Sequence, residues 1–191
     1  MIIYLTIISI TILIIFFINF SIGNFNIIYI FLNILFNIIY ILIIDAFLAW
    51  AINQLPEKWF NYNYKRFKIF KWEKKFYEAI KIKKWKEKIP ELGQLANFKK
   101  DKIKEPFNNQ YINKYLLECV YGEMVHLISI FFGFIIILFN LKEWYIYCLP
   151  IAIANGIISY LSYAILRYNR PKLMTIQKRN NRIKERSKNI N

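Results

Sequence analysis

The stretch IIYLTIISITILIIFFINF, residues 2–20, decides the fold class, because it contains no charged residue along its whole length. At a rise of about 1.5 Å per residue, a helix of this length crosses the roughly 30 Å hydrocarbon core of a bilayer. The stretch has no basic flank and no small-residue cleavage site, both of which a secretory signal peptide would carry. We therefore expect a retained transmembrane helix here.

Three further apolar runs of similar length follow along the chain. A content of 57% hydrophobic and 19% aromatic residues is too apolar for a soluble domain of 191 residues. The predicted fold is an all-α integral membrane protein, with a single membrane domain over residues 1–191. Its four transmembrane helices are expected at about residues 2–20, 27–50, 122–141 and 144–167.

Basic residues are distributed unevenly around the predicted spans. Of the 27 Lys and Arg residues, 17 lie in the central segment 53–118, nine lie from Arg167 onward, and the last is Lys142. Basic residues that flank spans are retained on the cytoplasmic side. The central segment and the tail 168–191 are therefore predicted to be cytoplasmic, in a multi-pass protein of the cell membrane with both termini inside.

The central basic segment interleaves lysines with apolar residues at helical spacing. A first stripe contains Ile69, Trp72, Phe76 and Ile80, and a second stripe, after a phase shift, contains Ile82, Trp85 and Ile89. This pattern is typical of amphipathic helices in the membrane interface, with aromatic rings toward the bilayer and ammonium groups near anionic headgroups. Nucleic acid is the competing partner for a basic segment. Because no nucleic-acid-binding motif accompanies it, we expect anionic membrane lipids and no nucleic acid.

Ionisable residues within or beside the spans are few, and they mark functional sites because their burial in hydrocarbon is costly. They are Asp45, Glu123, His126 and Arg167. In an alternating topology of four helices, all of them come near the inner membrane surface. Their convergence predicts a site at that level.

Glu123 and His126, the only histidine in the chain, stand one helical turn apart and therefore share a helix face. A carboxylate beside an imidazole fixes its tautomer and stabilises the imidazolium, as a general base requires. Two other interpretations stay open, a histidine that only bonds a neighbouring helix and a histidine that binds a metal. Since no second histidine and no matching motif exist, we expect no metal and no resident cofactor.

The third and fourth predicted helices carry stripes of small and polar residues. The stripes are Cys119, Gly122, His126, Ser129 and Gly133 on the third helix, and Ala152, Gly156, Ser159 and Tyr163 on the fourth. Small residues let membrane helices approach closely, so the two stripes are expected to pack together.

Several motifs occur in an order and spacing that one protein family also shows. They are LPEKWF (55–60), FKIFKWEKKFYEAIKIKKWKEKIPELG (67–93), GEMVHLISI (122–130), and IAN (153–155) followed by RYNRPKL (167–173). By these motifs the chain resembles the glycosyl-4,4'-diaponeurosporenoate acyltransferases, small bacterial membrane enzymes that put a fatty acyl chain on the sugar of a glycosylated carotenoid acid. The chain departs from the family pattern at Leu127, where an aromatic residue is expected, and in its first apolar helix.

The resemblance implies acyl transfer from a thioester donor, such as an acyl-coenzyme A, to a hydroxyl of a sugar-bearing lipid in the bilayer. His126 would act as general base, and Glu123 would orient its imidazole. Residues expected to bind the substrate or the donor are Arg167, Asn169, Arg170, Trp85, Asp45 and Tyr163. The two arginines are expected to bind donor phosphates, with Pro171 ending or kinking the fourth helix just beyond them. The active site is expected on the cytoplasmic side, where a soluble donor meets a lipid acceptor.

A second class of function also fits the composition. A non-catalytic membrane protein could bind anionic lipids or a partner through the polybasic loop alone. Such a protein needs only surface basic residues and would tolerate replacement of Glu123 and His126 together. The resemblance favours the acyltransferase.

Overall fold

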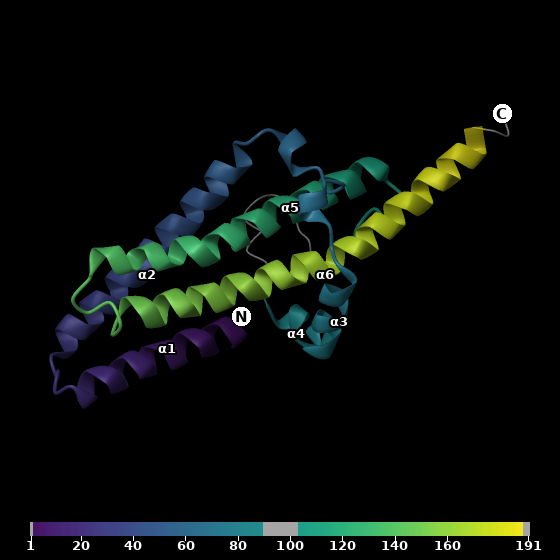
Figure 1. Cartoon of the computed structure of the whole chain (residues 1–191). Coiled ribbons are helices and arrows are strands. Elements are labelled where there is room, and N and C mark those ends of the chain that lie inside the picture. The colour runs from purple at the N-terminus through teal and green to yellow at the C-terminus, as the bar shows by residue number, and fades with distance from the viewer. Residues whose placement is uncertain (1, 90–102, 189–191) are drawn as a thin grey trace. The chain divides into compact units, whose positions relative to one another are not determined.

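The computed structural model describes residues 2–89 and 103–188 (Figure 1). Over these residues the chain forms helices, turns and short loops, with no strand. Four of the helices are long and apolar enough to cross a membrane. The expected all-α membrane fold with four spans is therefore confirmed.

The first two spans are α1 (Ile2–Ser21) and α2 (Ile27–Asn53), which a short turn connects. Gly23 in this turn has a φ of 78°, a left-handed conformation that a glycine adopts without steric cost. The side chain of Asn26 then accepts a hydrogen bond from the backbone N–H of Tyr29 at 3.1 Å, which caps the start of α2.

The other two spans are α5 (Asn109–Phe132), which continues as the 3-10 helix η5 (Gly133–Phe139), and α6 (Cys148–Lys188). Pro171 was expected to end or kink the last helix; it does not end it, because α6 continues through it to Lys188. An interior proline removes one backbone hydrogen bond, at a cost of about 3 kcal/mol. Packing offsets this cost, since Leu173 just beyond the proline is 2% exposed and belongs to a buried cluster.

The chain divides into two compact units. The apolar unit comprises Met1–Gln54 and Met124–Tyr163, and the basic unit comprises Leu55–Glu123 and Ala164–Asn191. α5 and α6 each contribute residues to both units.

Asn19 and Tyr147 bond to each other within the apolar unit, where hydrocarbon offers no water as a partner. Asn19 of α1 is fully buried and donates to the carbonyl of Ile15 at 2.8 Å. Its amide oxygen accepts from the hydroxyl of Tyr147 at 2.7 Å. Around these bonds lies a core of apolar side chains from α1, α2, the turn before α6 and the first turn of α6: Ile15, Ile30, Ile34, Ile41, Ile146, Tyr147 and Ile151.

The two stripes of small residues pack together in this unit. The hydroxyl oxygens of Ser129 on α5 and Ser159 on α6 lie 3.1 Å apart. A Cβ atom at Gly133 would come within 2.8 Å of Nδ2 of Asn155, so only a glycine fits there without displacing that side chain. The expected close approach of these helix faces is confirmed.

The basic unit has its own core between α5 and α6, formed by Ile112, Tyr115, Leu116, Cys119, Leu166 and Leu173. Its surface segments include the 3-10 helices η1 (Glu57–Phe60), η2 (Lys65–Phe67) and η3 (Lys86–Lys88), and the α-helices α3 (Lys71–Ala79) and α4 (Ile82–Trp85).

The phase shift between the two apolar stripes has a backbone cause. α3 ends at Ala79, and Lys81 then adopts a φ of 54° in the left-handed region before α4 begins. The ring nitrogen of Trp85 donates to the carbonyl of Ile80 at 2.9 Å and closes this corner.

Candidate functional site

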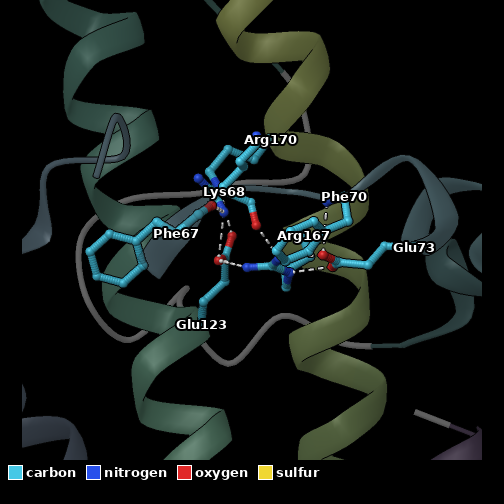
Figure 2. Close-up of polar contacts among 7 residues, drawn as sticks. All are labelled: Phe67, Lys68, Phe70, Glu73, Glu123, Arg167 and Arg170. Carbon is cyan, nitrogen blue, oxygen red and sulfur yellow. Dashed lines mark hydrogen bonds and ion pairs between the residues drawn. The ribbon is translucent and has the colours of Figure 1, made fainter. Parts of the chain in front are cut away.

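Two arginines and two glutamates form a buried charge network in the basic unit (Figure 2). Arg167 and Arg170 project from α6, one turn apart. Glu123 comes from α5, and Glu73 comes from the first turn of α3. Each of the four residues is at most 6% exposed. The network carries two positive and two negative charges, so its burial leaves no formal charge uncompensated.

Arg170 uses its guanidinium as a fork on Glu123. Its Nε donates to Oε1 at 2.7 Å, and its Nη2 donates to Oε2 at 3.0 Å. The same Nη2 also donates to the backbone carbonyl of Phe67 at 2.5 Å. Paired, charge-assisted bonds of this kind are among the strongest that side chains form.

Arg167 binds both glutamates of the network. Its Nε and Nη2 donate to the two oxygens of Glu73, at 2.6 and 2.7 Å, and its Nη1 donates to Oε2 of Glu123 at 3.3 Å. Nη2 also donates to the backbone carbonyl of Lys68 at 2.9 Å. Oε2 of Glu123 therefore accepts from both arginines. The backbone carbonyl of Lys68 also attaches the segment before α3 to Arg167 of α6.

Glu73 keeps its negative charge despite its burial. Burial alone would raise the pKa of this carboxyl, but the hydrogen bonds from Arg167 and from the backbone N–H of Phe70, with the charges of Arg167 and Arg170, lower the pKa below its ordinary value. The bond from Phe70 to Oε1 is 3.0 Å long and also satisfies a free N–H at the start of α3. One carboxylate thus both caps a helix and neutralises an arginine.

The sequence analysis did not anticipate Glu73 as a site residue. One signal was present, since Glu73 and Tyr77 stand four residues apart and therefore share a helix face. A carboxylate on a face that packs against the protein needs a basic partner, because a lone buried carboxylate is strongly unfavourable.

The basic unit also contains a cavity of about 620 Å³, which two of the predicted donor-binding residues line. Arg167 and Asn169 line this cavity. Trp85 is partly buried on α4, next to the lining residue Lys86. Arg170 is 1% exposed, and its guanidinium faces Glu123.

Three predicted site residues belong to the apolar unit, namely His126, Asp45 and Tyr163. His126 lies on α5, three residues after Glu123, and is partly buried. Asp45 on α2 accepts a hydrogen bond from the hydroxyl of Ser129. Tyr163 is partly buried on α6. Across residues 2–89 and 103–188, no cluster of three or more His, Cys, Asp or Glu side chains is arranged to hold a metal ion.

Comparison with known proteins relates the chain to one family. Residues 56–179 match the sequence pattern of glycosyl-4,4'-diaponeurosporenoate acyltransferases. The chain belongs to this family. Membership confirms the expected enzyme class, an acyltransferase, and the matched region contains His126 and the whole charge network. No curated protein and no solved structure matches the chain.

Proposed function

We propose that this membrane acyltransferase moves a fatty acyl group from a thioester donor to a hydroxyl of a sugar-bearing lipid, of the glycosyl-4,4'-diaponeurosporenoate type. The family match over residues 56–179 carries this proposal. Four spans suit an acceptor that stays in the bilayer. A donor with a polar headgroup would reach the enzyme from the aqueous side.

His126 acts as the general base in this proposal. With an ordinary pKa of about 6.5, a histidine can take up and return a proton near neutral pH. The imidazole takes the proton of the sugar hydroxyl while the oxygen attacks the thioester carbonyl. The tetrahedral intermediate then collapses, the carbon–sulfur bond breaks, and the departing thiolate receives the proton. General-base assistance of this kind contributes about 10²-fold to 10⁴-fold in rate.

Glu123 orients the imidazole of His126, and two arginines hold the carboxylate of Glu123 in place. Three hydrogen bonds from Arg167 and Arg170 fix the position of Glu123, one helical turn before His126 on α5. A catalytic pair depends on such supporting residues, because small displacements of the base reduce the rate strongly. Arg167, Arg170 and Glu73 are thus positioning residues in this mechanism.

The test is transfer by purified enzyme in lipid nanodiscs, with a labelled acyl-coenzyme A, a glycosylated carotenoid acid and product detection by mass spectrometry. His126→Ala is expected to lower the rate at least about 10²-fold, as loss of a general base implies. Lys178→Ala, an exposed site on α6, is the matched control and should retain the wild-type rate.

The same assay separates the enzyme from a non-catalytic lipid-binding protein. Normal product formation by His126→Ala would overturn the role of this histidine. Lipid extracts of cells with and without the gene should differ by the acylated glycolipid. Identical extracts would favour the protein that binds lipids through its basic loop.

A further inference from the structure

The cavity of the basic unit has a strongly basic lining. Its volume of about 620 Å³ falls within the roughly 300–1,000 Å³ typical of small-molecule sites. The cationic lining residues are Lys74, Lys83, Lys86, Arg167 and Lys172. Among the described lining residues, Glu87 alone is acidic.

The arginine of the lining is neutralised inside the protein, whereas the lysines outnumber their acidic neighbour. Arg167 is paired with Glu73 at 2.6 Å, so its charge belongs to the buried network. Lys74 also meets Glu78, outside the lining, at 4.0 Å. The remaining three lysines still outnumber Glu87, so the cavity has an excess of positive charge. A concave surface lined by one sign of charge concentrates its field and attracts ligands of the opposite sign.

One lysine of the cavity is held by side chains of α6. Nζ of Lys86 donates to Oδ1 of Asn169 at 3.3 Å and lies 6.0 Å from the ring centre of Tyr168. The ring of Tyr168 in turn meets Tyr77 of α3 edge-on, with centroids 6.3 Å apart. These contacts keep the ammonium group of Lys86 at the cavity wall, beside the ring of Tyr168.

We propose that this cavity binds the phosphate groups of an organic phosphate. Lysine ammonium groups supply charge and hydrogen-bond donors to phosphate oxygens. The amide nitrogen of Asn169 adds a neutral donor, and Tyr77 and Tyr168 offer ring surface to the organic part of the ligand. The occupant is a phosphate ester with an organic portion rather than a bare anion.

The inference deepens the proposed function and rests on it for the identity of the ligand. The phosphate ester is the headgroup of a coenzyme A thioester, the donor of the proposed reaction. The lysines of the cavity, rather than Arg167 and Arg170, then bind the donor phosphates. The fork of Arg170 is already engaged with Glu123 and with the carbonyl of Phe67.

The experiment measures binding without catalysis. Full-length protein in zwitterionic nanodiscs is titrated by calorimetry with desulfo-coenzyme A, which has the phosphates but no thiol. In a second arm, soluble short-chain phosphatidylglycerol is the ligand. Lys86→Gln and Lys172→Gln are each expected to weaken binding of desulfo-coenzyme A about tenfold, the effect of losing a hydrogen bond to a charged group.

Controls identify the source of the phosphate and the place of binding. Lys178→Gln on α6, outside the cavity, should bind like the wild type. Lysine-dependent binding of phosphatidylglycerol alone would support the phosphate site and assign it to a lipid headgroup. Equal weakening by Lys178→Gln, or unchanged binding in both cavity variants that retain the wild-type thermal midpoint, would overturn the proposal. His126→Ala should bind normally, so a failure of the proposed base and a failure of this site are distinguishable.

Discussion

Arg170 and Glu123 form a bidentate ion pair with bonds of 2.7 and 3.0 Å, and their side chains are only 1% and 2% exposed. The pair connects α6 to α5 just one turn before His126. A buried pair of this kind contributes little net stability over apolar residues, but its disruption leaves a buried charge without a partner. The pair therefore fixes how α5 packs against α6 more than it raises the free energy of unfolding.

Replacement of one partner is expected to destabilise the fold strongly. Arg170→Leu should cost about 3–5 kcal/mol, because the carboxylate of Glu123 stays buried with fewer donors. Arg170→Lys should lower the free energy of unfolding by a smaller amount, since an ammonium group keeps the charge but cannot reproduce the planar fork. Thermal unfolding in detergent measures both, with Lys178→Leu, an exposed site on the same helix, as the control. Equal midpoints for Arg170→Leu and the control would contradict a structural role for the pair.

Acid should destabilise the protein through Glu73. The folded pKa of this carboxyl lies below its unfolded value, so its contribution is complete above the unfolded pKa of about 4.3 and is lost as pH falls toward the folded pKa. The thermal midpoint of the wild type should therefore decrease between about pH 5 and pH 3. Glu73→Gln should start lower and show a flatter dependence.

Glu78→Gln is the matched control for this titration. Glu78 lies on the same helix, its side chain is 49% exposed, and it meets Lys74 only at 4.0 Å. Exposed pairs of this kind contribute little to stability. If Glu78→Gln flattened the acid dependence as much as Glu73→Gln, the network would not be its source.

The fold was more predictable than the site, for a physical reason. Four spans follow from local composition, because a helix in hydrocarbon satisfies its own backbone wherever its neighbours lie. The network depends on residues far apart in sequence, since Arg167 meets Glu73 and Glu123 across separations of 94 and 44 residues. Helical spacing identified Glu123 but could not show that α3 returns to α6. For the same reason, Arg170 was expected to bind donor phosphates, whereas its guanidinium is buried and paired with Glu123.

A methyl group should disrupt the apolar unit at one glycine and leave the other unaffected. At Gly133 a Cβ would lie 2.8 Å from Nδ2 of Asn155, whereas at Gly156 the nearest atom would be 3.9 Å away. Gly133→Ala must therefore displace Asn155 from Ser129, while Gly156→Ala should be tolerated. Thermal midpoints of the two purified variants measure the difference. A midpoint for Gly133→Ala at or above that of Gly156→Ala would show that these helices do not approach so closely.

The topology predicted from the basic residues can be tested with introduced cysteines. Native Cys119 and Cys148 are each 1% exposed and should be replaced by alanine to give a background without thiols. In intact cells, an impermeant maleimide should then label Lys142→Cys, because the predicted topology places the link 140–143 outside. Lys184→Cys, which is exposed near the end of α6, should react only after lysis. The reverse pattern would place both termini outside.

The exposed face of α3 should contact the bilayer at the level of the headgroups. This helix turns Glu73 and Tyr77 inward, while Trp72 and Phe76 are 65% and 43% exposed. Lysines occupy other exposed positions of the same helix, which is the pattern of an interfacial amphipathic segment. In a variant that retains Trp72 as its only tryptophan, lipids brominated near the carbonyl end of their acyl chains should quench the fluorescence more than aqueous iodide does. A second variant that retains only Trp85, whose ring nitrogen is bonded within the protein at 2.9 Å, is the control and should be quenched less by both reagents. Stronger quenching of Trp72 by iodide than by brominated lipid would mean that this face of α3 meets water, and that the lysines alone attract the membrane.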